Sequence, residues 1–160
     1  MASRRKSRIL AFQALYWWEA SYLDGPHRVS AVPPKKTSIE ELVSFSWLEE
    51  EKRSKMDEGT STFSVTLIAG TIENIKKIDK IIKKHLENWD ISRINRVDLA
   101  VLRMSVYSLM FQTDISPSIV IDEAIGICRE FGSDDSFRFI NGVLDSIRKT
   151  LQNKIQEKKE

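Results

Sequence analysis

Apolar residues recur at spacings of three and four along most of the chain, which is the period of an amphipathic helix. The longest stripe begins at Phe63 and continues through Ile72 to Leu86. No alternation of strand and helix segments interrupts the pattern. The pattern predicts an all-α fold, a bundle of about seven helices in two packed halves, with helices at 7–23, 38–47, 61–86, 92–95, 97–111, 117–131 and 136–147.

The last two helices are expected to meet at a tight turn, residues 132–135, which we call the corner. Gly132 predicts the end of the first of them, because a residue just past a helix often takes a left-handed conformation that glycine adopts without a clash. Ser133, Asp134 and Asp135 supply side-chain oxygens and negative charge, which suit the exposed amides of a new helix.

Gly142 lies in the middle of the second helix of the corner. A glycine there costs about 1 kcal/mol relative to alanine. Because a missing side chain lets two backbones approach closely, we expect a neighbouring helix to pack against Gly142. Replacing it by leucine should then destabilise the protein by overpacking.

A chain of 160 residues with 41% hydrophobic content is long enough for one domain with its own core. We divide residues 1–160 into an N-terminal helical half at 1–90, a C-terminal half at 91–150 and a polar tail at 151–160 that frays from the last helix. Proline and glycine predict a loop over 24–37, and a polar stretch at 49–62 predicts a second break.

The single cysteine, Cys128, excludes an internal disulfide and fits a reducing cytosol. It lies on an apolar stripe, which predicts a buried and unreactive thiol. No run reaches the roughly 18 apolar residues of a membrane span. We therefore expect a soluble, cytoplasmic protein with no membrane partner.

The basic residues are unevenly placed, although the net charge is only +2. Four of them precede the first acidic residue and begin the first helix: Arg4, Arg5, Lys6 and Arg8. Cations near a helix N-terminus are unfavourable by a few tenths of a kcal/mol, so stability does not account for them. Two interpretations remain, a solubilising chain end and a patch that contacts phosphates.

A second group of cations lies on one face of the predicted helix at 61–86. Its members are Lys76, Lys77, Lys80, Lys83 and Lys84. A lysine row of this kind is usually only a solvated face, and the sequence leaves open whether it has a partner.

The chemistry of an enzyme is missing from this sequence. His27 and His85 have no cysteine or second histidine at metal-ligand spacing, and no glycine-rich phosphate loop occurs. Asp134 and Asp135 are adjacent on a helix and so point in different directions. We therefore expect no catalytic residue, no metal and no cofactor.

Recognition of single-stranded RNA requires cations for the phosphates and flat or polar groups for splayed bases. The first helix offers the cations, and Phe131, Phe139 and Tyr16 offer aromatic rings. Phe137 lies on the apolar stripe with Ile140, so it is the weaker candidate. For each phenylalanine, ordinary core packing is the competing interpretation.

Three stretches resemble one protein family. The run FG-SDD-SFRF-INGVLD resembles the C-terminal signature of the bacterial transcription antitermination factor NusB family, and SRRKSRILAFQALYWWE and LRMSVYSL resemble its first helix and an internal helix. The resemblance implies an all-helical protein that binds boxA RNA together with NusE, a small-subunit ribosomal protein. The pair helps RNA polymerase ignore terminators, in ribosomal RNA operons among others, without catalysis.

The resemblance also implies site residues. Carried over by position, the RNA-binding residues are Arg4, Arg5, Lys6, Arg8, Gln13, Phe131, Asp135 and Phe139. The surface facing NusE includes Tyr16 and Asp98, where Asp98 replaces a glutamate of the family. Some members form homodimers that cover the RNA face, so a homodimer stays an alternative to a monomer.

Two other functions remain open. A similar helical domain occurs in front of an RNA cytosine methyltransferase, but we expect no such enzyme here because the chain leaves no room for a nucleotide-binding domain. The other is a protein-interaction module whose basic helix contacts an acidic protein. RNA binding that depends neither on salt nor on the boxA sequence would favour this module.

Overall fold

The computed structural model describes residues 3–22, 36–87 and 90–159. Within these residues it contains eight α-helices and one 3₁₀ helix and no strand, so the all-α prediction is confirmed. The elements in chain order are α1 (Arg4–Tyr22), α2 (Lys36–Val43), α3 (Glu50–Ser54), α4 (Glu58–Glu73), α5 (Ile75–Lys84), the 3₁₀ helix η1 (Ile91–Arg93), α6 (Arg96–Phe111), α7 (Pro117–Phe131) and α8 (Ser136–Lys159).

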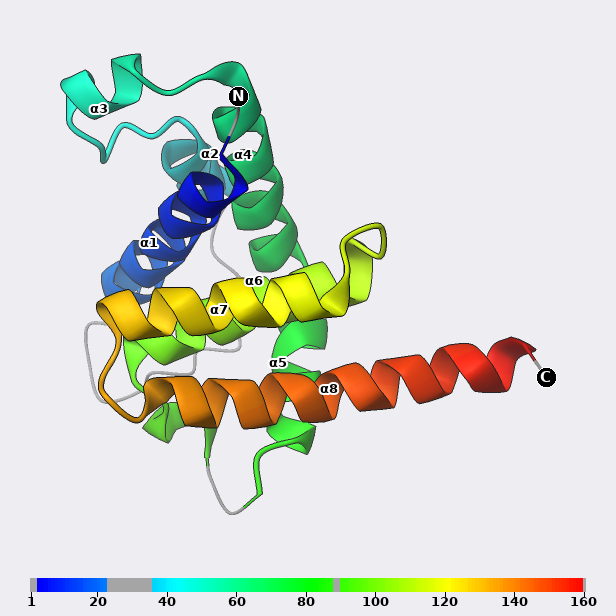
Figure 1. Cartoon of the computed structure of the whole chain (residues 1–160). Helices are drawn as coiled ribbons and strands as arrows, with labels where there is room; N and C mark the ends of the chain where they lie inside the picture. The colour runs from blue at the N-terminus through cyan, green and yellow to red at the C-terminus, as the bar shows by residue number, and fades with distance from the viewer. Residues whose placement is uncertain (1–2, 23–35, 88–89, 160) are drawn as a thin grey trace.

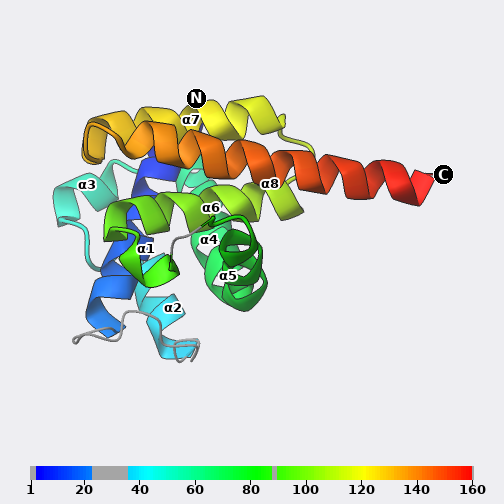
Figure 2. The same ribbon diagram turned by 90° about the horizontal axis from the view of Figure 1, so that it is seen from below.

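Helix α6 lies at the centre and contacts α1, α4, α5, α7 and α8. Helix α1 packs along α4, and α7 and α8 run antiparallel side by side (Figures 1 and 2). The last turns of α8 extend beyond the rest of the molecule in both views. The polar tail predicted to fray is therefore helical as far as Lys159.

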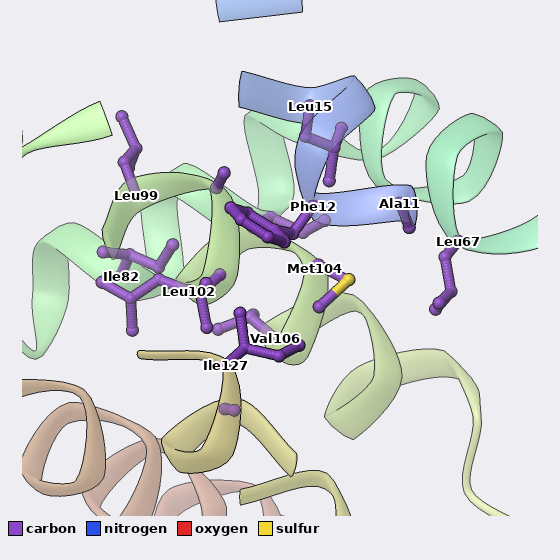
Figure 3. Packing of buried hydrophobic residues seen from close by; sticks show 14 of the residues in the cluster. Ala11, Phe12, Leu15, Leu67, Ile82, Leu99, Leu102, Met104, Val106 and Ile127 are labelled. Carbon is purple, nitrogen blue, oxygen red and sulfur yellow. The ribbon is translucent and has the colours of Figure 1, made fainter. Parts of the chain in front are cut away.

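The core forms around α6 because almost every side chain of its first ten residues is buried. Figure 3 shows Phe12 of α1, Ile82 of α5 and Ile127 of α7 gathered around Leu102 and Val106 of α6. Burial of each such side chain contributes about 1.5–3 kcal/mol. Apart from Val120, the buried hydrophobic residues of the described chain belong to one cluster, to which α3 contributes none, and the division of the chain at residue 90 stays a prediction.

A buried charged cluster ties three helices together. Arg103 of α6 is only 5% exposed. Its Nε and Nη2 each donate to the carboxylate of Asp79 in α5 over 2.9 Å, and its Nη1 donates to Glu19 of α1 over 2.6 Å. These contacts explain how an arginine lies within an apolar stretch, since a buried charge requires partners.

The prediction of one long helix at 61–86 is wrong in one respect, because Asn74 interrupts the helix and separates α4 from α5. The Asn74 side chain donates to the Gly70 carbonyl over 2.8 Å. A short amide that bonds to the backbone in this way competes with the regular helix ladder.

The two predicted breaks in the N-terminal half differ from the structure. Residues 24–35 of the predicted loop lie outside the described residues, and α2 begins at Lys36, inside that range. The predicted break at 49–62 contains α3 and the beginning of α4. Asp57 caps α4, because its carboxylate accepts from the Thr60 amide over 2.7 Å.

Gly132 ends α7 but is not left-handed as predicted. Its φ and ψ of −94° and −173° are extended. A Cβ at this position would lie 2.7 Å from the Cys128 carbonyl oxygen and 3.0 Å from Ser136 Oγ, so glycine is required by space.

The predicted caps at the corner are also replaced by other contacts. The Ser133 amide donates to Ser136 Oγ, and the Ser136 amide donates to the Ser133 carbonyl, both over 3.1 Å. In the described part of the chain, neither Asp134 nor Asp135 accepts a hydrogen bond from α8.

Among the described residues, the close helix contact predicted at Gly142 is absent. Gly142 is exposed, and a Cβ there would meet no atom within 4 Å. The close approach occurs instead at Gly70 of α4, where a Cβ would collide with the ring of Tyr107 of α6. The expectation that leucine at position 142 overpacks the protein is therefore wrong.

No helix among the described residues combines the length and the apolar character needed to cross a membrane.

Candidate nucleic-acid interface

The first turn of α1 presents exposed cations and is anchored to α4. Arg4, Arg5 and Lys6 are exposed. Ser7 is buried, and its Oγ donates to the Thr60 carbonyl over 3.1 Å. The guanidinium carbon of Arg4 lies 4.0 Å from the centre of the Phe63 ring, a cation–π contact. The predicted basic patch is thus held on a folded surface.

Arg5 reaches across to α7. Its Nη1 and Nη2 lie 3.6 Å from carboxylate oxygens of Glu123 and Glu130, respectively, and its side chain is 47% exposed. Between these two acids, a Cβ at Gly126 would lie 2.9 Å from Arg5 Nη1. The absence of a side chain at Gly126 therefore leaves space for the arginine.

Arg8 differs from the expectation because it is only 5% exposed. Its guanidinium lies 5.4 Å from the centre of the Phe63 ring. Burial lowers the pKa of Arg8, while the nearby Glu123 acts in the opposite direction. A buried guanidinium is poorly accessible to a phosphate in solvent, so we leave Arg8 out of the interface. Arg8 instead packs beneath the basic surface.

Phe131, at the end of α7, joins the corner to α1. Its ring centre lies 5.0 Å from that of Phe12, and 37% of the residue is exposed. Gln13, the next residue of α1, is half-buried. These contacts bring the basic first turn of α1 and the corner, far apart in sequence, onto adjoining parts of one surface.

Beyond Phe131, the corner borders a hollow of about 290 Å³, which we call the corner hollow. Phe139 is half-buried and Asp135 is exposed. The hollow brings both predicted residues together with polar side chains of α6 and the 3₁₀ helix; its lining is Arg93, Ile94, Asn95, Asp98, Ser133, Asp135, Ser136 and Phe139.

Asp98 is 5% exposed, which differs from its expected place on a partner-facing surface. Its Oδ2 accepts from Asn95 Nδ2 over 2.9 Å and from Ser136 Oγ over 3.1 Å. Burial raises the pKa of this carboxyl group. Asp98 therefore holds the corner against α6, whereas Tyr16, the other residue expected to face NusE, is 39% exposed.

His27 lies outside the described residues, and the other histidine and the cysteine are engaged in the fold. Cys128 is fully buried, and burial together with the charge of Asp98 raises the pKa of its thiol to about 12. Both ring nitrogens of His85 have a hydrogen-bond partner: Nδ1 lies 2.9 Å from the Ile81 carbonyl oxygen, and Nε2 lies 2.9 Å from the Thr150 hydroxyl oxygen. The described residues contain no group of three or more histidine, cysteine or acidic side chains that could hold a metal ion.

Sequence reasoning missed several residues of this surface. Glu123 and Glu130 were not singled out, although a spacing of seven places them on one face of a helix with Gly126 between them. Trp17, which is 56% exposed beside Tyr16, was also missed, and its position off the apolar stripe of α1 was the available signal. Nothing in the local pattern indicates that Arg93 lines the corner hollow.

Known proteins match the chain over most of its length. The model of the NusB family matches residues 5–149. A curated relative from Treponema denticola, called transcription antitermination protein NusB, is 48% identical over 145 residues, which cover 91% of this chain and 95% of the relative.

Solved structures match in the same way. NusB of T. maritima superposes with a TM-score of 0.74 at 31% identity, covering 93% of each chain. A structure described as antitermination factors NusB and NusE in complex with dsRNA has a TM-score of 0.72 at 24% identity, covering 92% of this chain and 96% of that one, and shows likeness of fold. Taken with the matching family model and the relative of 48% identity, the helical fold described above places this chain in the NusB family.

Proposed function

We propose that this protein is a transcription antitermination factor that binds boxA-type single-stranded RNA together with NusE and promotes processive transcription of ribosomal RNA operons, without catalysis. Family membership supports the proposal, because the curated relatives carry the name of a transcription antitermination protein. The complex named above is described as NusB and NusE with double-stranded RNA.

The observation that carries the proposal is the contact of α1 with the end of α7. Arg5 lies between Glu123 and Glu130, and Phe12 packs on Phe131. Exposed cations and an exposed aromatic ring are thereby adjacent, and binding of a single strand requires both groups.

Each group has a stated role on this surface. Arg4, Arg5 and Lys6 neutralise phosphates, with Gln13 beside them as a polar contact. Phe131 and Phe139 stack on bases, and Asp135 accepts a hydrogen bond from a base or sugar. Three phosphate contacts to a single strand would give a log–log slope of binding against salt of about −2.

We assign the surface for NusE to α1. Tyr16 and Trp17 are exposed, on a turn of α1 beyond the basic residues. Aromatic side chains are common at protein interfaces because they bury a large area at a low entropy cost. Asp98 acts here indirectly, by fixing the corner. The wider partner is the RNA polymerase antitermination complex in the cytoplasm, and a homodimer is the alternative state that covers the RNA face.

The test is a charge reversal with a matched control. Arg4→Glu/Lys6→Glu should weaken binding of a boxA RNA by about tenfold or more. The melting temperature should fall only slightly, since both side chains are exposed and the Arg4–Phe63 contact is worth about 0.5–1 kcal/mol. The control, Lys76→Glu/Lys77→Glu, changes the net charge equally on the exposed face of α5. An equal loss in both variants would contradict a defined RNA surface on α1.

A further inference from the structure

A second hollow lies on the other side of Phe139. It measures about 380 Å³ and lies between the end of α5 and the middle of α8, and we call it the Gly142 hollow. Its lining includes His85, Leu86, Arg138, Phe139, Gly142 and Val143. Phe139 also lines the corner hollow, so the two hollows adjoin the same aromatic side chain. Figure 1 shows the lower end of α5 emerging beneath α8, where the two helices meet.

The glycine in this hollow packs against no helix of the described part of the chain. Gly142 is exposed in the middle of a 24-residue helix, and a Cβ there would meet nothing within 4 Å. Such a glycine costs about 1 kcal/mol relative to alanine. Since no contact with another described residue offsets this cost, the bare backbone at Gly142 points to a ligand that lies close to α8.

Three cations lie in the lining or directly before it in sequence, and one of them, Lys83, also acts on the nearby Asp90. Lys83 and Lys84 form the last turn of α5, directly before His85, and Arg138 is exposed on α8. None of these three forms a salt bridge with another described residue. Glu87 is the acidic residue of the lining, and the His85 ring is already hydrogen-bonded on both sides.

We propose that the Gly142 hollow binds the continuation of the same single-stranded RNA, so that the strand passes from the corner hollow over Phe139 to the last turn of α5. One base lies on the bare backbone at Gly142, against the apolar side chains of Leu86 and Val143. The flanking phosphates lie near Lys83, Lys84 and Arg138. This inference rests on the proposed function.

The combination of features favours RNA over a protein segment. A flat base can lie on exposed backbone, and it gains from apolar and aromatic neighbours whatever its sequence. Cations on two sides, without a salt bridge to any described residue, match a polyanion. A lysine row first interpreted as a solvated face thereby gains a partner at its C-terminal end.

The experiment compares RNAs of two lengths on the full chain. One RNA is a boxA core, and the others carry three more nucleotides at the 5′ or the 3′ end. One extended RNA should bind the unaltered protein roughly fivefold or more tightly than the core, as expected for one additional stacked base. Its salt dependence should be steeper by about 1 in log–log slope.

Two variants should remove this gain and leave core binding unchanged. Gly142→Leu fills the hollow, and Lys83→Gln/Lys84→Gln removes the two lysines beside it. Lys76→Gln/Lys77→Gln, at the other end of α5, is the matched control and should keep the gain. Gly142→Ala should raise the melting temperature, which checks that the position tolerates a side chain.

The outcomes separate this inference from the function it rests on. Failure of every RNA to bind would contradict the proposed function. Core binding with no gain at either end, or a gain that survives Gly142→Leu, would overturn the Gly142 hollow as an RNA site. Loss of NusE binding in Gly142→Leu with no effect of RNA length would instead assign the hollow to a protein partner and would equally overturn the inference.

Discussion

Asp98 is a residue whose role in the structure differs from the one that the family resemblance implied. The resemblance implied a contact with NusE, but two hydrogen bonds fix its carboxylate beneath the corner. Its Oδ1 is buried without a hydrogen-bond partner among the described residues. A buried, partly unsatisfied carboxylate is costly when ionised. The stability of the corner should therefore depend on the protonation of Asp98.

The pH dependence of stability tests this role of Asp98. Burial raises its pKa in the folded protein above the ordinary value of 3.8, so the folded state binds the proton more tightly than the unfolded state. Ionisation of Asp98 therefore lowers the free energy of unfolding. This loss is complete above the raised pKa and disappears as the pH falls to about 3.8. As the pH falls from 7 to 4, the melting temperature of the unaltered protein should therefore rise relative to that of Asp98→Asn.

Calorimetric melts of the two proteins across this range give the comparison. A constant difference between them would contradict a perturbed Asp98.

Single residues show which parts of the site a sequence can predict. Arg8 is three, four and seven positions before the buried Ala11, Phe12 and Leu15, so the helical period already indicates its inward direction. Burial of Asp98 depends on Asn95 and on Ser136 of a distant helix. The open surroundings of Gly142 likewise depend on where α5 ends, which no local pattern contains.

At the scale of the elements, the buried cluster of Arg103 joins α1, α5 and α6. Arg103→Met keeps an apolar stem but leaves Glu19 and Asp79 without their cation. Loss of one partner from a buried ion cluster typically costs about 3–5 kcal/mol, so we expect a decrease of that size in the free energy of unfolding, measured with urea.

The matched control for Arg103→Met is Arg148→Met. Arg148 pairs with Asp145 at the surface of α8, where 28% and 37% of the two side chains are exposed. Such a pair contributes about 0–1 kcal/mol. Equal losses in the two variants would argue against a special role of the cluster.

The contact between α1 and α7 should also regulate RNA affinity. A carboxylate oxygen of Glu130 lies 3.6 Å from Arg5 Nη2, so Glu130 competes with a phosphate for the same guanidinium. Its neutralisation in Glu130→Gln should tighten RNA binding by up to about fivefold, because an exposed pair is worth at most about 1 kcal/mol.

Glu51→Gln is the control for this prediction, since Glu51 pairs with Lys55 on the separate helix α3. Titration of labelled RNA measures both variants. Weaker binding by Glu130→Gln would mean that the acid positions Arg5 for RNA instead of competing for it.

The amphipathic stripes predicted most helices because burial follows the helical period. The break at Asn74 was missed, since the apolar stripe continues through it at Ile72, Ile75 and Ile78 while only one side chain interrupts the backbone ladder. The helical end of α8 was missed for the opposite reason. Its residues beyond Leu151 are exposed, so hydrophobic pattern carries no signal there.

At the scale of the whole molecule, the candidate interface combines the beginning of the chain with residues 123–139. Hydrophobic periodicity predicts both segments but not their contact, which α6 makes possible by packing against α1, α7 and α8. The resemblance of the two segments to one family provided that link before the structure did. The geometry then separated exposed residues such as Lys6 and Phe131 from buried ones such as Arg8.

The most direct test of the central claim is the affinity of the purified chain for a boxA strand and a scrambled strand, with and without its own NusE, at several salt concentrations. The proposed function predicts tighter binding of boxA, a further gain with NusE, and a log–log salt slope of about −2 to −3. Binding that ignores both the RNA sequence and NusE would contradict it, and would leave a basic helical domain whose partner is another protein.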